Sequence, residues 1–207
     1  DYRGDRFKDY AYPLKGNNDL LVLTQPHIIQ NIHEAFLEAG ADLIETNTFN
    51  ANRISMLDYH MQDLVNELNT QAVNLARAAC EKYSTPDKPR FVLGSMGPTN
   101  KTASISPKVN DPAYREVDFD ELASVYEQQA TALLLAGVDG LLVETIFDTL
   151  NAKAAFYGIQ EAMDQTQIHV PLMASGTITD KSGRTLSGQT TEAFIVSLQH
   201  IPLLSIG

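Results

Sequence analysis

Apolar residues follow two different patterns along the chain, and the two alternate. Long stretches repeat apolar side chains at helical spacing, while short continuous apolar runs are typical of buried strands. The helical stretches cover residues 24–40, 62–82, 118–137, 148–165 and 190–200. The predicted strands cover residues 42–49, 91–96, 140–146, 170–175 and 203–206. A strand that follows every helix predicts an α/β protein with parallel strands and crossover helices.

Capping residues mark several of the predicted helix ends. Thr24 is the expected N-cap of the first helix, and Asp148 that of the fourth. Asp118 and Glu121 have capping-box spacing at the start of the third helix, which Gly137 is expected to end.

Two segments show no such order. Residues 1–23 are rich in turn formers and predict no regular element. Residues 97–117 form a polar connection that is too long for an ordinary loop, which predicts a functional or a mobile segment.

A (β/α)₈ barrel is favoured over a doubly wound sheet. The shorter strand-to-strand intervals are close to the roughly 30 residues of a barrel unit. A weak repeat relates AGADLIETNTF (39–49) to AGVDGLLVETIF (136–147), and both copies place Glu-Thr at the polar end of an apolar strand. A doubly wound dinucleotide-binding sheet would favour a G-x-G-x-x-G turn after its first strand, and the sequence has none.

Composition narrows the class of protein further. The 207 residues are 43% hydrophobic and 20% charged, as in globular domains. A net charge of −11 argues against duplex nucleic acid or an anionic membrane as the main partner. No apolar run reaches the roughly 18 residues of a spanning helix.

The cysteine count bears on redox chemistry and location. One cysteine, Cys80, excludes a disulfide or a multi-cysteine zinc site within the chain, and a cytoplasmic location is expected. The missing initiator Met suggests a fragment.

Polar side chains gather where the predicted strands end, the position that carries function in parallel α/β folds. The ends contain Glu45–Thr48, Gly94–Asn100, Glu144–Thr145 and Ser175–Thr177. Carboxylates, hydroxyls and backbone N–H groups with few basic residues suit a small zwitterion. Glu144 is the stronger candidate of the two glutamates because it follows the longer apolar run. The alternative is that Glu45 and Glu144 only satisfy structural hydrogen bonds or lie near solvent.

Other motifs carry weaker signals. Lys101-Thr102 imitates a phosphate-binding loop, but Asn100 and Ser95 stand where glycines are required, so a turn is favoured. The loop 182–190 would either bind an anion at a helix start or serve as a simple cap. Cys80 is expected to pack in the core, and the five histidines have no metal-binding spacing.

Longer segments at these strand ends resemble a known family. They closely resemble the homocysteine-binding module of cobalamin-dependent methionine synthases, in the homocysteine S-methyltransferase family. The similarity runs through essentially the whole chain. The segments that carry it are LKGNNDLLVLTQP, EAGADLIETNTFNAN, LGSMGPTNKTASISP, NDPAYR, VDGLLVETIFDTLNAKAA and SGTITDKSGRTLSGQTTEAF.

The resemblance implies a (β/α)₈ barrel that binds homocysteine and a zinc ion held by three cysteines. Zinc lets the substrate sulfur bind as a thiolate, which takes a methyl group from methylcobalamin carried by another module. A further module recharges cobalamin from methyltetrahydrofolate. Glu144 matches the glutamate that pairs with the homocysteine amino group. Five further residues match strand-end segments that face or border the substrate: Thr46, Asn47, Thr48, Ser175 and Gly176. No catalytic residue is assigned.

The sequence also departs from the family pattern. It matches an incomplete barrel domain over residues 1–207, with strands two to six of eight, and lacks the first strand, the last two strands and all three zinc cysteines. Zinc and cobalamin are therefore expected only in a full-length parent, and the chain alone is expected to transfer no methyl group. The alternatives are a homocysteine methyltransferase that uses betaine or S-methylmethionine, and an inactive fragment.

Overall fold

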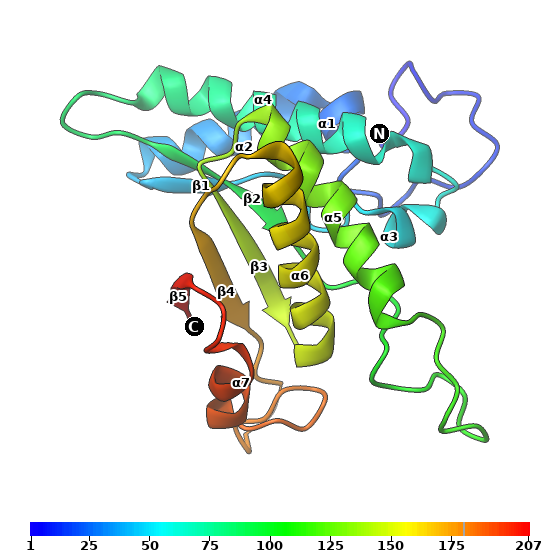
Figure 1. Cartoon of the computed structure of the whole chain (residues 1–207). Helices are drawn as coiled ribbons and strands as arrows, with labels where there is room; N and C mark the ends of the chain where they lie inside the picture. Colours follow the sequence, from blue (N-terminus) through cyan, green and yellow to red (C-terminus); the bar gives the residue numbers. More distant parts are fainter. Residues whose placement is uncertain (180) are drawn as a thin grey trace.

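The computed structural model describes residues 1–179 and 181–207 and contains a five-stranded parallel sheet (Figure 1). The strands are β1 (Leu43–Glu45), β2 (Phe91–Met96), β3 (Gly140–Ile146), β4 (Leu172–Gly176) and β5 (Leu203–Ile206). Their spatial order is β1-β2-β3-β4-β5, so each strand lies beside its neighbour in sequence. This order is that of consecutive barrel strands, and it confirms a partial (β/α)₈ barrel.

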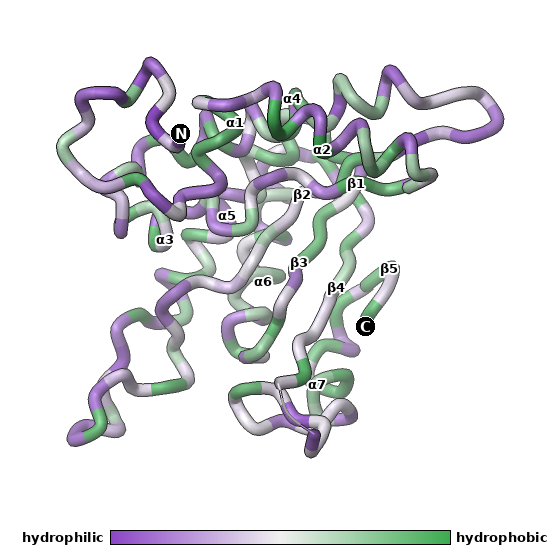
Figure 2. Tube along the Cα trace, turned by 180° about the vertical axis from the view of Figure 1, so that it is seen from behind, coloured by the Kyte–Doolittle hydropathy of each residue, from purple (hydrophilic) through white to green (hydrophobic). Residues whose placement is uncertain are grey.

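The helices gather on one face of the sheet. They are α1 (Leu21–Thr24), α2 (Pro26–Glu38), α3 (Arg53–Leu57), the 3₁₀ turn η1 (Gln62–Leu64), α4 (Val65–Tyr83), α5 (Phe119–Ala136), α6 (Thr149–Thr166) and α7 (Thr191–Leu198). Figure 2 turns the opposite face toward the viewer, and there β3 and β4 lie in front of the helices. No helix of the described residues has the length and apolar character that crossing a membrane requires.

Alternation along β3 explains how this sheet has two different faces. Leu141 and Val143 are 0% and 3% exposed and belong to the main core between the sheet and its helices. Leu142 and Glu144 point the other way, since successive side chains alternate across a strand. Glu144 is half-buried on that second face.

Most predicted helix ends are confirmed. The Asp118 carboxylate accepts a hydrogen bond from the Glu121 backbone N–H at 2.8 Å, and Asp148 accepts one from Leu150 at 3.0 Å. Gly137 ends α5 with φ 93°, a left-handed conformation in which a side chain is strained.

The N-terminal predictions are partly wrong. Residues 21–24 form the short helix α1, so Thr24 lies inside a helix and Gln25 takes the N-cap position of α2. The Thr24 hydroxyl donates a hydrogen bond to the Leu20 carbonyl, so it is engaged in α1 and does not cap α2. Because turn-forming residues cluster over residues 1–23, the sequence pattern did not predict this single turn of helix.

Helix α2 carries apolar residues on two neighbouring faces, and only one of them is buried. The stripe with Ile28, Ile32 and Phe36 is 41–61% exposed. The buried face instead carries residues one position later, namely Ile29, His33 and Leu37. The exposed stripe lies beside β1, an edge strand, where no described segment covers it.

Two other boundaries differ from the prediction. β1 has three residues where eight were expected, because the chain leaves the ladder at Thr46. The expected helix over 62–82 begins as η1, and α4 starts at Val65. The polar connection after β2 contains no helix or strand before α5, as predicted.

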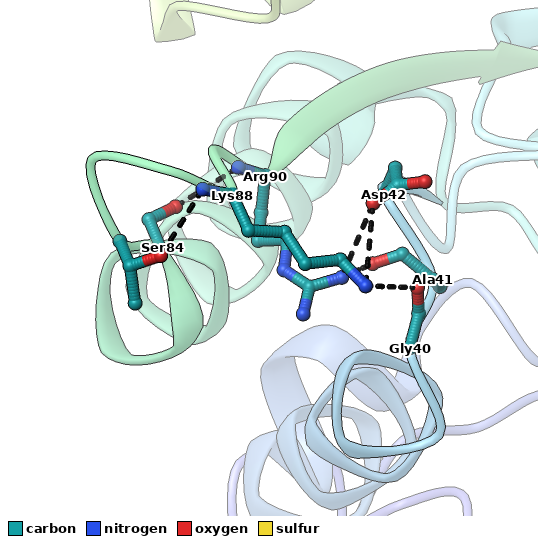
Figure 3. A network of polar contacts seen from close by, with 7 residues as sticks. Gly40, Ala41, Asp42, Ser84, Lys88 and Arg90 are labelled. Atoms are coloured by element: carbon teal, nitrogen blue, oxygen red, sulfur yellow. Dashed lines mark hydrogen bonds and ion pairs between the residues drawn. The ribbon is translucent and has the colours of Figure 1, made fainter.

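The amino ends of β1 and β2 are joined by a polar network (Figure 3). Lys88 Nζ donates to the Gly40 carbonyl at 3.2 Å and lies 3.7 Å from an Asp42 carboxylate oxygen. The Arg90 guanidinium lies 3.5 Å from the same oxygen and also donates to the Ala41 carbonyl. These contacts fix the end of the sheet that lies opposite the candidate functional residues.

Candidate functional site

The carboxyl ends of β2 and β3 bring one hydroxyl and one carboxylate together. Ser95 Oγ donates a hydrogen bond to Glu144 Oε1. Ser95 is 1% exposed, whereas Glu144 is half-buried and open to the helix-free face. Among the described residues no ion pair includes Glu144. The arrangement is a carboxylate held by one hydroxyl, without an ion pair in the part of the chain that the structure describes.

The main chain of Ser95 is tied to the end of β1. The Ser95 N–H donates to Thr46 Oγ1 at 3.0 Å, and the Ser95 carbonyl accepts from Thr48 Oγ1 at 2.7 Å. The two threonine hydroxyls are 2.6 Å apart and hydrogen-bonded to each other. Thr46 and Thr48 are 4% and 0% exposed, so they form a supporting network beneath Ser95.

Buried amides extend this network toward the helices. Gln129 Nε2 on α5 donates to the Thr48 carbonyl at 2.8 Å. The Tyr126 hydroxyl lies 3.0 Å from the Gly97 carbonyl and 2.7 Å from Asn151 Oδ1 on α6. Complete burial raises the pKa of Tyr126 well above its usual range, which keeps the phenol protonated as a donor.

A second carboxylate, Glu45, lies at the end of β1. Partial burial is the main cause that raises its pKa, and the negative charge of Glu144 raises it further. No side-chain hydrogen bond or ion pair is found for Glu45 among the described residues. Glu45 therefore shares the electrostatic environment of Glu144 without being fixed by a neighbour.

The chain is strained immediately after Glu144. Thr145 has φ 57°, a left-handed conformation that is unfavourable for a β-branched residue. The β3–β4 register shifts between Val143 and Ile146, so Thr145 lies in an irregularity of the ladder. Strained residues of this kind are common where a strand end must aim a side chain at a site.

Asn47 lies at the rim of a cleft of about 440 Å³ along β1. The cleft is lined mainly by α2 and β1 side chains and reaches Glu45, Thr46 and Asn47. Asn47 Nδ2 donates to the Asn18 carbonyl at 2.8 Å, which ties the end of β1 to the N-terminal segment.

Ser175 and Gly176 end β4, one strand beyond Glu144. Ala174 pairs with Val143, so Ser175 lies beside the Glu144 position in the ladder. Gly176 instead lines a small apolar cavity against Phe194. A Cβ at Gly176 would come within 2.9 Å of the Phe194 ring, so close packing explains this glycine.

Sequence reasoning missed the residue that organises these groups. The sequence placed Ser95 within the polar strand end Gly94–Asn100 and as a departure from a phosphate loop, but gave it no role of its own. No helix follows Lys101 and Thr102 in the structure, so the framework of a phosphate loop is not built. A small hydroxyl at the end of a buried strand, one strand from Glu45 on one side and one strand from Glu144 on the other, was the available signal.

Metal-binding capacity is limited in the described part of the chain. Within residues 1–179 and 181–207 no three His, Cys, Asp or Glu side chains cluster around a possible metal position. Cys80 is 1% exposed in α4, and burial raises the pKa of its thiol to about 11, which disfavours the thiolate that zinc needs. As predicted, Cys80 packs in the core.

The strand order defines a parallel α/β domain of the partial-barrel type, with polar groups gathered at its strand ends. A family model described as Homocysteine S-methyltransferase matches residues 3–207. The chain belongs to this family.

Solved structures support the fold. The homocysteine methyltransferase MmuM from Escherichia coli, in its metallated form, matches with TM-score 0.73 and 21% identity. The match covers 90% of this chain and 64% of that chain. The oxidized form of MmuM gives TM-score 0.72 at the same identity, with 63% of its length covered. This chain therefore spans a little under two thirds of the length of these relatives.

Proposed function

We propose that this chain forms the amino-acid-binding part of a homocysteine methyltransferase, with Glu144 as the partner of the homocysteine ammonium group. The observation that carries the proposal is the hydrogen bond from Ser95 Oγ to Glu144, on a carboxylate without a cationic partner among the described residues. An ammonium ion would supply that partner, and charge-assisted hydrogen bonds are the strong ones. Family membership supports homocysteine as the substrate.

In this proposal Ser95 is a positioning residue. Its hydroxyl occupies one Glu144 oxygen and leaves the other free for the substrate. Thr46 and Thr48 hold the Ser95 main chain, and their hydroxyls are engaged with each other and with β2. We place Asn47, Ser175 and Gly176 at the border of the pocket, where they shape it.

Zinc would supply a Lewis acid that keeps the substrate sulfur as a thiolate at neutral pH. The described residues do not fit a zinc site, because no metal-binding cluster is found and Cys80 is buried and protonated. We therefore assign no step of the reaction to zinc held by this chain. Ammonium recognition by Glu144 does not depend on where the metal is held.

We propose further that the parent protein is a cobalamin-dependent methionine synthase. The support is the close resemblance of the GNND and GRTLSGQTTEAF segments to that subgroup. Methylcobalamin would donate the methyl group, and separate modules would carry cobalamin and methyltetrahydrofolate. A cytoplasmic setting fits a free thiol substrate, because reducing compartments keep thiols unpaired. A donor such as betaine or S-methylmethionine is the alternative, and product formation with each donor in the full-length protein distinguishes them.

The ammonium contact is tested with two ligands and two proteins. Calorimetric titration compares homocysteine with 4-mercaptobutyrate, which lacks only the amino group. We expect the unmodified chain to prefer homocysteine by roughly 10–100-fold, the range for one hydrogen bond between charged groups. Glu144→Gln should lose most of that preference while binding 4-mercaptobutyrate almost unchanged.

A matched control removes the same charge elsewhere. Glu81 is exposed on α4, on the helical side of the sheet, so Glu81→Gln should keep the full preference. The proposal is wrong if Glu144→Gln still discriminates between the ligands as the unmodified chain does. It is also wrong if Glu81→Gln loses discrimination to the same extent, because the effect would then be one of net charge.

A further inference from the structure

A small polar cavity lies beside the candidate site, between the N-terminal segment and the loops that follow β1 and β2. Its volume is about 140 Å³, and its lining includes Asp19, Asn50, Ser55, Asp58, Tyr59 and Asn100. Asp19 and Ser55 form a buried floor at 3% and 7% exposure, and Asp58 and Asn100 form an exposed rim. No Lys, Arg or His lines it among the described residues.

The floor carries a carboxylate that the chain does not neutralise. Asp19 Oδ1 accepts a hydrogen bond from the Asn50 N–H at 2.8 Å. Hydrogen bonds lower the pKa of Asp19, but burial outweighs them and raises it to about 6. At neutral pH the carboxyl is mostly ionised in a desolvated position, which is costly without a counter-charge.

The Ser55 hydroxyl is an independent observation that points to a ligand. Ser55 lines the cavity, and its Oγ is buried with no hydrogen-bond partner among the described residues. A buried hydroxyl normally has a partner, so an unpaired one indicates an ion or a water bound in the cavity. Asp19 and Asp58 line the same cavity and no basic residue among the described residues does, which favours a cation.

We propose that this cavity binds a hard divalent cation, with Asp19 and Asp58 as charged ligands and Ser55 Oγ as a neutral ligand. Asn100 orients the rim, because its Nδ2 donates to Asp58 Oδ2 at 2.7 Å. Carboxylate and hydroxyl oxygens from separate segments match the flexible coordination of Ca²⁺ better than the strict octahedron of Mg²⁺. Two carboxylates are few, so the expected dissociation constant is about 10⁻⁴–10⁻³ M.

Such a cation would join four segments that are distant in sequence. They are the Asp19 loop, Asn50 after β1, α3 with Asp58, and Asn100 after β2. Asn18, next to Asp19, accepts the hydrogen bond from Asn47 at the rim of the candidate site. The ion would therefore stabilise the loops beside the strand ends without contacting Glu144, and the inference does not depend on the proposed substrate.

Terbium luminescence provides the binding test. Tb³⁺ replaces Ca²⁺ and emits when a nearby aromatic ring transfers energy to it. The chain has no Trp, and Tyr59 lines the cavity, so tyrosine excitation should report occupancy. We expect saturable emission that Ca²⁺ displaces more effectively than Mg²⁺. Asp19→Asn should weaken Tb³⁺ binding at least about tenfold, and Tyr59→Phe should lower the emission with little change in the Ca²⁺ midpoint.

The control removes one charge from another exposed site. Asp87→Asn changes an exposed residue in the turn between α4 and β2 and should bind Tb³⁺ as the unmodified chain does. Equal weakening in Asp19→Asn and Asp87→Asn would show binding to the acidic surface in general and overturn the proposal. Absence of saturable emission, or of displacement by Ca²⁺, would overturn it as well.

Thermal unfolding gives a second readout that does not rely on Tb³⁺. Ca²⁺ at about ten times its dissociation constant should raise the Tm by about 3–5 °C at constant ionic strength. Asn at position 19 can still accept the Asn50 hydrogen bond, so Asp19→Asn should fold and lose the shift. If that variant does not fold, Asp58→Asn at the exposed rim replaces it and should reduce the shift. An undiminished Ca²⁺ shift in whichever variant folds would contradict the proposal.

Discussion

Two strands of this molecule end in the same dipeptide, Glu-Thr, and the structure uses the two copies differently. At the end of β1, Glu45 is largely exposed and its side chain has no hydrogen-bond partner among the described residues, while Thr46 is buried and hydrogen-bonded to β2. Near the end of β3 the roles reverse. Glu144 is held by a hydrogen bond, and Thr145 has no side-chain hydrogen bond among the described residues and adopts a left-handed backbone.

The strand between them accounts for the difference. β2 pairs with β1 on one side and β3 on the other. Ser95 gives its main-chain groups to Thr46 and Thr48, and gives its side chain to Glu144. One residue therefore makes one strand end a structural support and the other a candidate binding group.

The largest difference between the two strand ends is expected in the free energy of unfolding, when Thr46 and Thr145 are each replaced by glycine. Thr46→Gly removes a buried hydroxyl that accepts from Ser95 and bonds Thr48, so we expect unfolding to become easier by about 2–3 kcal/mol. Thr145→Gly relieves a positive φ and should stabilise by up to about 1 kcal/mol. Urea unfolding measures both. Changes of the same sign would contradict the different roles assigned to the two ends.

Ser95→Ala tests the link between the ends. The variant keeps the main-chain bonds to Thr46 and Thr48 and loses only the hydrogen bond to Glu144. We expect homocysteine affinity to fall roughly tenfold, because Glu144 is no longer oriented, while the free energy of unfolding changes by about 1 kcal/mol or less. Ser95→Thr, which keeps a hydroxyl, should restore part of the affinity if the strand accommodates the methyl group. An unchanged affinity in a folded Ser95→Ala chain would remove the positioning role.

The smallest effect is a change in pH dependence at Glu45. Its pKa is raised in the folded chain, so the folded state binds the proton more tightly than the unfolded state. Stability from this group is therefore present at low pH and is lost as the pH rises above the ordinary value of 4.5. Glu45→Gln should become more stable relative to the unmodified chain between about pH 4 and pH 7 in urea unfolding. A relative stability that does not change with pH would show that Glu45 is unperturbed.

The sequence was sufficient for the regular parts of the fold. β2, β3 and β5 have the predicted bounds, because continuous apolar runs between polar ends allow few alternatives. Asp118 and Asp148 cap their helices as expected. These features depend on local spacing, which a sequence shows directly.

The errors arose where tertiary contacts override local patterns. In α2 apolar residues recur on two adjacent faces, one with Ile32 and one with Ile29, so helical spacing alone does not show which face is buried. β1 is short because the ladder stops after the Thr46 N–H bonds to the Leu93 carbonyl, and the Ser95 N–H then donates to the Thr46 hydroxyl, a side chain, in place of a β1 carbonyl. The pairing of Ser95 with Glu144, 49 residues away, has no local signature. The assignment of substrate roles to the strand-end residues stays a prediction.

The most direct test of the account is the selectivity for the amino group, measured in Glu45→Gln and Glu144→Gln side by side. Both variants remove one carboxylate from a Glu-Thr strand end. Calorimetry with homocysteine and 4-mercaptobutyrate should show that Glu144→Gln loses most of the roughly 10–100-fold preference, while Glu45→Gln keeps it. Equal losses in the two variants, or loss only in Glu45→Gln, would contradict the claim that Ser95 selects Glu144 as the ammonium partner.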